Sequence, residues 1–500
     1  MKKINVLIIS FILLISTFIY GCSNAGNSTS SNNKKIVVGT NAEFEPFEYI
    51  NDEGEIDGFD PAVIKEIAKN MGYDVEFRNM EFKSLTAALK NGSLDVVIAG
   101  MTITEERKES VNFSDSYYTA TQCIIIPKGS SISSLEDLNG KRVAVQEGTT
   151  GDILVTPAED NERITDSNTT VKRFKKGSDA VLELKNGGVD AVVIDESPAE
   201  KYVSLNSNIL ELFKDDKSTE SYGIAVAKGN DELLADINEG LKKFKDSGEF
   251  EKLVDEYINK EHDLGEIDSS NFFEKTIKKI KYVFIDTNGY KLLIKGLGST
   301  IGITVSAIAI GAILGFLIAL MKMTEVKAKK KTIISRIAGA YISVIRGTPV
   351  VVQLLIMYMV IFKSHYGFIA AILTFGLNSS AYVAENIRAG IMAVDNGQME
   401  GGLSLGFTYS QTMRYVILPQ SIKNCLPALG NEFVALLKET SIVGYIAIQD
   451  LTKAADFIIS RTYETFMPLI AIAIVYFVIV MILTKLVQKM ERRLRQSDIR

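Results

Sequence analysis

One polar stretch interrupts the apolar final third of the chain: residues 397–420, which read GQMEGGLSLGFTYSQTMRYVILPQ. Its beginning has the features of a short helix. Asp395 and Gln398 have the spacing of a capping box, in which two side chains satisfy free amides at a helix start. Gly406 is well placed to end this helix in the left-handed conformation that glycine adopts without strain.

The rest of the stretch predicts a second short helix. Thr408 and Gln411 repeat the capping-box spacing, and Pro419 is expected to stop the helix because its ring removes a backbone donor. An ordinary connecting loop is the alternative. A helix–turn–helix between apolar segments is more typical of a docking surface, so we expect a partner outside the chain to hold it.

Composition divides the 500 residues into two unlike parts. Polar, acidic sequence precedes about residue 270, and long apolar runs follow about residue 295. The net charge of −6 and the lack of a basic patch argue against nucleic acid as a partner. Cysteines at 22, 123 and 425 and two distant histidines have no metal-ligand spacing, so no metal site and no disulfide framework is expected.

The N-terminus has the pattern of an export signal. Two lysines precede an apolar run at residues 4–20, which is short for a membrane span. Residues 19–22 resemble the lipobox of bacterial lipoproteins, although Tyr20 is bulkier than is usual there. The resemblance implies a signal peptide at 1–21, a lipidated Cys22 and a flexible tether at 22–34; an uncleaved anchor or a plain signal is the alternative.

Residues 35–262 alternate short apolar strands with amphipathic helices, which predicts an α/β fold. A helix is expected at 61–71, ending before Gly72. Strands are expected at 35–39, 74–77, 95–99, 142–145 and 190–194. Apolar segments at 121–127 and 222–227 are expected to cross between two lobes that close on a ligand.

Six stretches of this part resemble the polar amino acid-binding proteins of bacterial uptake systems. They are GTNAEFEPFE (39–48), GFD (58–60), AGMTITEER (99–107), FSDSYY (113–118), VAVQEGTT (143–150) and VDAVVIDESP (189–198). The resemblance implies a two-lobed periplasmic-binding-protein-like domain of type II, outside the membrane, with an amino acid between its lobes.

The chemistry of a zwitterion points to the same residues. The fork of Arg107 matches a carboxylate, and Asp195 at a strand end suits an ammonium group. Phe44 and Phe82 are expected to form apolar walls, while Phe47 and Phe59 are expected in the core. The remaining candidate ligand-binding residues are Asn41, Ala99, Gly100, Thr102, Gln146, Thr149 and Thr150.

Specificity depends on Asn41 and Gln146, which lie where members of this family vary with substrate. Since position 41 is not acidic, a basic ligand is slightly less favoured. We expect glutamine first, and arginine, lysine or cystine next.

The part after the binding domain predicts an all-α transmembrane domain. A linker at 263–294 is expected to contain an amphipathic interfacial helix at 272–284. Five spans are expected within 295–490, at 296–321, 337–363, 366–392, 424–447 and 466–487, followed by a tail at 491–500. Export of the first domain then places the 397–420 loop and the tail inside the cell.

Three stretches here resemble the membrane subunit of ABC importers for polar amino acids: 295–300, 346–353 and 381–390. The 397–420 loop resembles the EAA loop of that family, with Glu400, Gly406 and residues 417–419 in place. Gly401 and Gly402 depart from the two alanines that are usual there. The resemblance implies that Glu400 and Gly406 couple the chain to an ATPase.

The chain contains no phosphate-binding loop of the type GxxxxGK(S/T). ATP hydrolysis is therefore expected from two copies of a separate ATPase subunit, and the chain is not expected to be an enzyme or to need a cofactor. Five spans form half of the usual pathway, which predicts a homodimer. Within the membrane, polar residues such as Glu385 and Arg388 are expected either to line the path or to pair with each other.

Together these features predict a fused binding and permease subunit of an amino acid ABC importer, multi-pass in the cytoplasmic membrane. An amino acid-gated channel is one alternative, but nothing in the sequence resembles a pore filter. A sensor or enzyme with the same binding fold is the other, but only spans and short loops follow residue 270.

Overall fold

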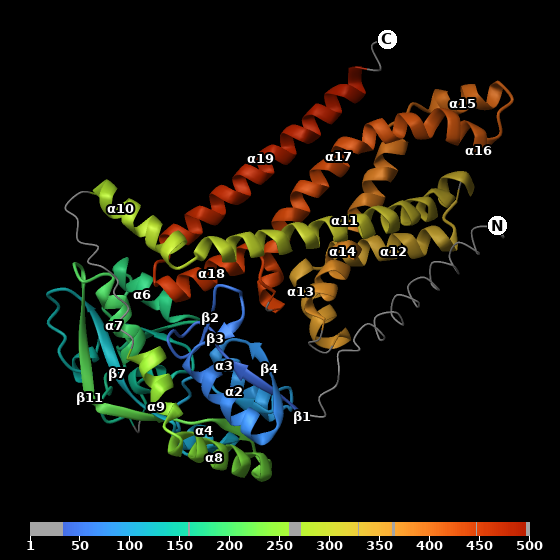
Figure 1. Cartoon of the computed structure of the whole chain (residues 1–500). Helices are drawn as coiled ribbons and strands as arrows, with labels where there is room; N and C mark the ends of the chain where they lie inside the picture. Colours follow the sequence, from blue (N-terminus) through green and yellow to red (C-terminus); the bar gives the residue numbers. More distant parts are fainter. Residues whose placement is uncertain are drawn as a thin grey trace.

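The computed structural model describes residues 34–158, 161–259, 272–328, 330–362, 366–446 and 448–496. The expected signal peptide, Cys22 and the tether up to residue 33 lie outside the described residues, as do residues 263–271 of the linker. The described chain forms a two-lobed α/β domain that lies against one end of a bundle of helices (Figure 1).

The first lobe contains a five-stranded sheet in the order β4-β1-β5-β12-β6. Strand β1 pairs in parallel with β4 and β5, whereas β12 is antiparallel to β5 and β6. The strands are β1 (Lys34–Thr40), β4 (Tyr73–Asn79), β5 (Val96–Val97), β6 (Val111–Phe113) and β12 (Ala225–Ala227). The helices are α2 (Phe59–Met71), α3 (Phe82–Lys90), α4 (Glu105–Ser110), α8 (Asp231–Asp246) and α9 (Glu249–Leu253), and a small hairpin joins β2 (Tyr49–Ile50) to β3 (Ile56–Asp57).

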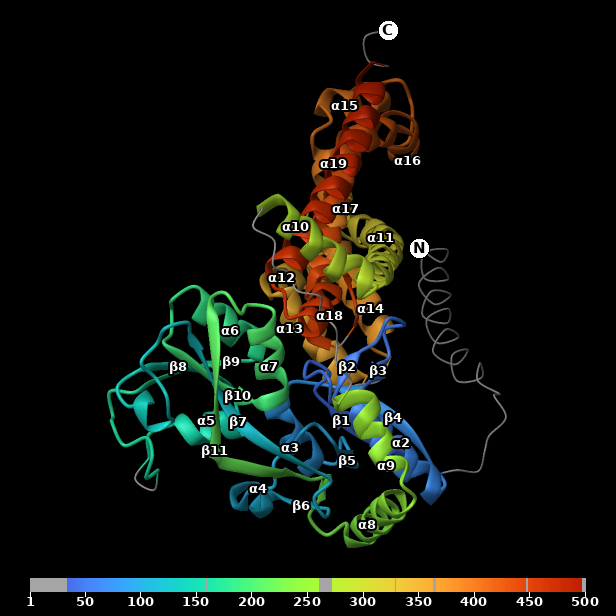
Figure 2. The ribbon, with the colours of Figure 1, turned by 60° about the vertical axis from the view of Figure 1, so that its left-hand side comes forward.

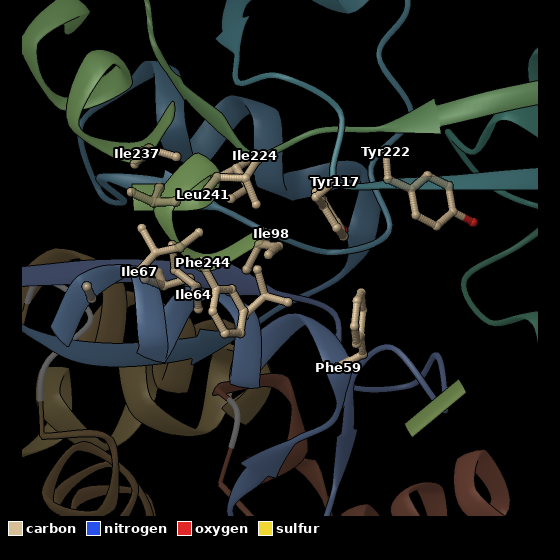
Figure 3. Packing of buried hydrophobic residues seen from close by; sticks show 14 of the residues in the cluster. Phe59, Ile64, Ile67, Ile98, Tyr117, Tyr222, Ile224, Ile237, Leu241 and Phe244 are labelled. Atoms are coloured by element: carbon tan, nitrogen blue, oxygen red, sulfur yellow. The ribbon is translucent and has the colours of Figure 1, made fainter. Parts of the chain in front are cut away.

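The core of this lobe lies between the sheet and helices α2 and α8. Ile64 and Ile67 on α2 face Ile237 and Leu241 on α8, and all four are buried (Figure 3). Helix α2 ends, as expected, at Gly72, whose φ of +74° is the left-handed conformation that favours glycine.

The second lobe contains a sheet in the order β11-β7-β10-β8-β9. Its strands are β7 (Tyr118–Pro127), β8 (Arg142–Gln146), β9 (Thr170–Phe174), β10 (Ala191–Asp195) and β11 (Leu210–Tyr222). Its helices are α5 (Thr150–Val155), α6 (Gly177–Lys185) and α7 (Glu196–Ser204). The expected strands of both lobes are confirmed, with ends that differ by a few residues.

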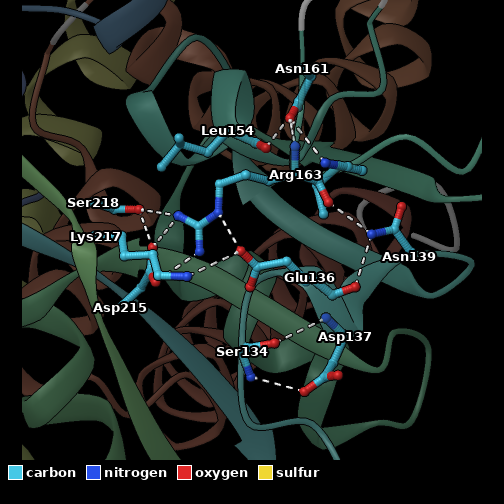
Figure 4. Close-up of polar contacts among 11 residues, drawn as sticks. Ser134, Glu136, Asp137, Asn139, Leu154, Asn161, Arg163, Asp215, Lys217 and Ser218 are labelled. Carbon is cyan, nitrogen blue, oxygen red and sulfur yellow. Dashed lines mark hydrogen bonds and ion pairs between the residues drawn. The ribbon is translucent and has the colours of Figure 1, made fainter.

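An irregularity in β11 is held by one arginine. The register of β11 against β7 shifts between Lys214 and Thr219. Arg163 donates from Nη1 and Nη2 to the two carboxylate oxygens of Asp215, at 2.6 and 2.9 Å, and pairs through Nε with Glu136 (Figure 4). The hydrogen bond and the charge of Arg163 lower the pKa of Asp215, so the carboxylate stays ionised. The two parallel hydrogen bonds of this ion pair hold the irregular segment of β11 in place.

The chain crosses between the lobes twice. The first crossing is at residues 114–117, between β6 and β7, just before the segment expected from the sequence. The second is at 223–224, between β11 and β12, within the expected segment. Two short crossings are the geometry of a hinge around which two lobes open and close.

The second half of the described chain is helical. Its elements are α10 (Phe272–Lys281), α11 (Gly289–Ala328), α12 (Ile333–Gly347), α13 (Val350–Leu355), α14 (Gly367–Met392), α15 (Asn396–Ser404), α16 (Tyr409–Thr412), α17 (Leu418–Glu439), α18 (Leu451–Thr462) and α19 (Phe466–Gln496). The binding domain lies at the α10 and α18 end of this bundle, and α15 and α16 lie at the opposite end (Figures 1 and 2).

Three described helices are long and apolar enough to cross a membrane: Gly289–Glu325, Gly367–Met392 and Phe466–Arg493. The pair Ile333–Gly347 and Val350–Ile361 adds a fourth span if it is counted as one, although it bends by 102°. The bend lies where Pro349 follows Thr348 in an extended conformation. The fifth expected span, 424–447, is mostly helix α17, which is not among these apolar helices.

The 397–420 loop forms the expected helix–turn–helix. Gly406 has φ +84° and follows α15, and Thr408 and Gln411 form a complete capping box at α16. The capping box expected between Asp395 and Gln398 at the start of α15 is wrong. The side chain of Asp395 instead accepts a hydrogen bond from the backbone amide of Gly397, at 2.7 Å. A short aspartate reaches this second helical amide and needs no reciprocal glutamine.

The expected stop at Pro419 is also wrong. After α16 the chain makes one π-helical turn at Met413–Ile417 and continues directly into α17. Pro419 is the second residue of α17, directly after the π-helical turn, so its missing N–H falls where the hydrogen-bond pattern changes from the fifth to the fourth residue back.

Gly401 and Gly402 have opposite surroundings, which predicts opposite effects of alanine. A Cβ on Gly401 would meet nothing within 4 Å, whereas one on Gly402 would lie 2.4 Å from Cγ2 of the buried Thr412. Gly401→Ala should stabilise α15 by up to about 1 kcal/mol and slow amide hydrogen exchange there about fivefold. Gly402→Ala should speed exchange in α15 and α16, measured on the full chain in nanodiscs.

Thr412→Ser removes the methyl group that a Cβ at 402 would strike. Added to Gly402→Ala, it should restore part of the lost protection. Equal effects of the two single alanine variants would contradict this account of the packing between α15 and α16.

Candidate functional site

A cavity lies between the two lobes, with about 320 Å³ of space between atoms, part of which is open to solvent. The structure brings all eleven sequence-predicted ligand-binding residues to its wall, together with Glu48, which was not predicted. The lining residues are Asn41, Phe44, Glu48, Phe82, Ala99, Gly100, Thr102, Arg107, Gln146, Thr149, Thr150 and Asp195. Most of them follow the ends of strands β1, β5, β8 and β10, where ligands of parallel sheets usually bind, whereas Phe82 begins α3 and Arg107 lies on α4.

Arg107 is held in the cavity by backbone oxygens. Its Nη1 donates to the carbonyl oxygen of Thr102 at 2.8 Å, and its Nη2 donates to that of Gly148 in the other lobe at 2.9 Å. The guanidinium carbon lies 5.4 Å from the centre of the Phe82 ring. Within the described chain no carboxylate lies within 4.0 Å of Arg107, so the buried cation has the capacity to bind an anionic group.

A chain of hydrogen bonds crosses the cavity floor from one lobe to the other. Thr150 Oγ1 donates to Thr102 Oγ1 at 2.7 Å, and Thr102 donates to the Glu220 carboxylate at 2.5 Å. Gln122 Nε2 then donates to the other oxygen of Glu220 and to Asp195. The sequence analysis missed Gln122 and Glu220, which follow no local pattern and support the site from behind.

Asp195 lies at the end of β10, where helix α7 begins. Burial, together with the neighbouring Glu220 carboxylate, raises the pKa of Asp195 well above its usual range. A cation placed beside Asp195 would reverse this effect. The position therefore suits an ammonium group of a ligand.

Glu48 is the cavity residue that the sequence analysis missed. Its side chain is buried beside the carboxyl group of Asp60, with which it forms a hydrogen bond when one of the two is protonated; among the described residues no N–H or hydroxyl group donates to it. Burial and the charges of Asp60 and Asp195 raise the pKa of Glu48 well above its usual range. A buried carboxyl group beside a second one is costly to ionise unless a donor or a cation occupies the space in front of it.

Asp60 supports the cavity from below Gly100. Its Oδ2 accepts from the amide of Gly100 at 2.7 Å and from the Tyr117 hydroxyl at 2.8 Å. Burial raises the pKa of Asp60 to about 6, although both hydrogen bonds favour the ionised form. Gly100 has φ +51°, and a Cβ there would lie 3.1 Å from the Phe44 ring, so this backbone lines the cavity at close range.

The lobes are closed around the cavity. Gln146 Nε2 donates to Asn41 Oδ1 across the cleft at 3.2 Å. At the rim, Lys83 pairs with Glu147 at 2.6 Å, and a further pair joins Lys175 to Glu81 at the same distance. Because these contacts join residues of different lobes, they exist only when the cleft is shut.

The polar residues of the helical half form local contacts. Arg388 pairs with Glu385 on the same helix, with Nε to Oε1 at 3.0 Å, and the Arg346 guanidinium lies over the Tyr382 ring at 4.9 Å. The sequence left open whether Glu385 and Arg388 line a transport path or pair with each other, and in this conformation they pair. In the described residues no group of three or more His, Cys, Asp or Glu has the geometry to hold a metal ion.

The 397–420 loop presents an exposed surface at the end of the bundle. Glu400 is exposed on α15, and Leu403, Leu405 and Phe407 are exposed beside it, with Leu405 at 80%. Apolar side chains grouped at a loop tip with an acidic residue are typical of a surface that a partner covers.

Comparison with known families agrees with this division of the chain. Residues 36–260 match the model of bacterial extracellular solute-binding proteins, family 3. Residues 293–496 match the model of the binding-protein-dependent transport system inner membrane component.

Individual relatives match each half separately. The arginine-binding extracellular protein ArtP of Bacillus subtilis (strain 168) is 38% identical over 52% of this chain and 100% of its own length. The arginine transport system permease protein ArtQ of the same organism is 38% identical over 45% of this chain and 98% of its own. The solved structure of an ancestral arginine-binding protein bound to arginine is 44% identical over 45% of this chain and 99% of its own, with a TM-score of 0.42.

Both halves thus match whole proteins that are separate polypeptides elsewhere. The chain belongs to the family 3 bacterial extracellular solute-binding proteins through its first half and to the inner membrane components of binding-protein-dependent transport systems through its second half.

Proposed function

We propose that this chain imports a polar amino acid across the cytoplasmic membrane, as the fused binding and permease subunit of an ABC importer. The observation that carries the proposal is a closed cavity with Arg107 on one wall and Asp195 on the other, joined in one chain to the permease helices. This pair matches the two charges of an amino acid, the carboxylate and the ammonium group.

Arg107 binds the α-carboxylate in this proposal. Two of its donors are occupied by backbone oxygens, which orient the fork toward the cavity. The backbone amide of the neighbouring Thr102 is a further donor on the same side, and Thr150 holds Thr102 in place because its hydroxyl donates to Thr102 Oγ1. Asp195 binds the ammonium group, and Phe44 and Phe82 exclude water from both ion pairs.

The ligand side chain is a cation in this proposal, with arginine as the first candidate. Four carboxyl groups are buried in or directly behind the cavity, Glu48, Asp60, Asp195 and Glu220, and Arg107 is the cation that faces them. The ammonium group of a zwitterion is balanced by its own carboxylate, so the acidic groups of the site still outnumber the basic ones, and among the described residues no N–H or hydroxyl group donates to Glu48. A guanidinium or a second ammonium group supplies the missing charge.

Glutamine, the first expectation from the sequence, is the second candidate. The amides of Asn41 and Gln146 meet at one side of the cavity, where they can exchange hydrogen bonds with a ligand amide. Relatives bear names of both kinds, an arginine-binding protein and a glutamine-binding protein GlnH of Bacillus subtilis.

The arrangement of the chain supports the direction of transport. Because the binding domain and the 397–420 loop lie at opposite ends of the bundle, they face opposite sides of the membrane. The binding domain lies outside, and two copies of an ATPase subunit hold the loop inside through Glu400. A second copy of this chain completes the pathway, covering apolar surface such as Ile356, Met359 and Val360 on the bent segment.

Substitution of Arg107 is predicted to abolish tight binding. Arg107→Ala leaves a ligand carboxylate buried without its cation, which costs about 2–5 kcal/mol and weakens affinity at least about 30-fold. Isothermal titration calorimetry of the full chain in nanodiscs against the twenty amino acids measures this. Lys108→Ala is the matched control, since Lys108 pairs with Glu105 on the outer face of the same helix. Full affinity in Arg107→Ala would rule out this pocket.

Substitution of Glu48 is predicted to change selectivity. Glu48→Gln removes a charge that attracts a cationic side chain, so it should weaken L-arginine about tenfold or more and L-glutamine much less. Competition between the two amino acids on the same sample gives the ratio. A parallel loss for both would show that Glu48 acts on the fold and not on the side chain of the ligand.

The raised pKa of Glu48 predicts a pH signature for arginine. A protonated Glu48 attracts no cation, so arginine affinity should fall as pH is lowered through this pKa and rise toward a plateau above it. Asp60 and Asp195 interact with Glu48 and contribute to the profile. The Glu48→Gln variant should flatten the part of the profile that Glu48 causes.

A further inference from the structure

Helix α18 of the permease half contacts both lobes of the binding domain. At its first turns, Lys453 pairs with Glu43 of the first lobe at 2.9 Å, and Asp456 pairs with Lys176 of the second lobe at 2.8 Å. Glu43 also lies 3.7 Å from Lys176, and Lys453 lies 3.7 Å from Asp456. The four side chains form one closed ring of alternating charge, which we call the α18 clamp.

The α18 clamp is protected from solvent. The side chain of Glu43 is 9% exposed and that of Lys453 is 16% exposed, so their attraction is weakly screened. Burial alone would raise the pKa of Glu43, but Lys453 and Lys176 outweigh it, and the net shift is downward. The carboxylate therefore stays ionised and paired in this docked arrangement.

At the other end of α18, Tyr463 also contacts residues of both lobes. The Tyr463 hydroxyl donates to the carbonyl oxygen of Glu45 in the first lobe at 2.7 Å. The ring of Tyr463 packs edge-on against Tyr202 of the second lobe, with centroids 4.4 Å apart. Both ends of α18 thus contact the two lobes together.

A separate group of contacts joins the permease half to the first lobe. Arg461 pairs with Asp52 in the β2–β3 hairpin at 2.8 Å, and Asn288 donates to the same carboxylate at 2.6 Å. Lys295 donates to the carbonyl oxygen of Glu53 at 2.6 Å. These contacts keep the first lobe attached whether the cleft is open or closed.

Opening of the cleft moves the second lobe away from the first, and with it Lys176 and Tyr202. The ring of charges and the tyrosine contact can therefore form completely only when the cleft is closed. Glu43 lies between the cavity residues Asn41 and Phe44, so one turn of chain faces the cavity on one side and α18 on the other.

We infer that the α18 clamp lets the permease half distinguish the closed binding domain from the open one, and that the membrane helices thereby tighten amino acid binding in the same chain. The inference rests on the proposed function. By linkage, a contact that favours the closed state raises the affinity of any ligand that binds the closed state better.

The test is the affinity of the full chain in nanodiscs for L-arginine and L-glutamine, measured by calorimetry. Asp456→Ala removes the contact with the second lobe and should weaken the better-bound of the two about fivefold or more. Asp456→Glu keeps the carboxylate and should retain the affinity of the unaltered chain. Arg461→Ala is the matched control on the same helix, since it removes a contact with the first lobe only, and it should change the affinity less than twofold.

Three results would overturn the inference. They are an unchanged affinity in Asp456→Ala, an equal loss in Arg461→Ala, or a loss in Asp456→Glu as large as in Asp456→Ala. If the unaltered chain binds neither amino acid nor any other of the twenty, the proposed function fails and this inference fails with it, which is a different result from tight binding that ignores Asp456.

Discussion

The closed cleft buries more negative than positive charge, and the rest of the account depends on that imbalance. Glu48, Asp60, Asp195 and Glu220 are buried in or behind the cavity, and the buried guanidinium of Arg107 lies near Asp195 and Glu220. Burial raises the pKa of three of these carboxyl groups, Glu48, Asp60 and Asp195, because their surroundings disfavour the ionised form. A ligand with an anionic group for Arg107 and cationic groups for the buried acids compensates both the buried guanidinium and the buried carboxyl groups. Closure and ligand binding therefore stabilise each other.

Closure matters to the helices because the two halves share one polypeptide and one interface. The turn that contains Asn41 and Glu43 connects the cavity wall to α18 within three residues. From α18 the helix bundle extends to the 397–420 loop at its far end. A physical route therefore exists from the ligand cavity, through a buried ring of charges, to the surface proposed for the ATPase.

The sequence predicted the cavity well because short motifs place its residues at strand ends. Glu48 was missed although it stands in a quoted motif, since a glutamate beside a short strand is normally solvent-exposed. Two predictions from local patterns were wrong. Pro419 does not stop the helix, because a π-helical turn leads directly into α17. Asp395 accepts a hydrogen bond from the amide of Gly397, which is closer along the chain than Gln398. The pairing of Glu43 with Lys453 joins positions 410 residues apart and has no local signal.

The central claim is that an amino acid captured in this cavity crosses the membrane through the same chain. Uptake of radiolabelled L-arginine and L-glutamine into proteoliposomes that contain the chain and its ATPase subunit tests it most directly. The account predicts accumulation that requires ATP on the side of the 397–420 loop and disappears in Arg107→Ala. Accumulation that persists in Arg107→Ala, or an amino acid-gated ionic current that needs no ATP, would contradict it.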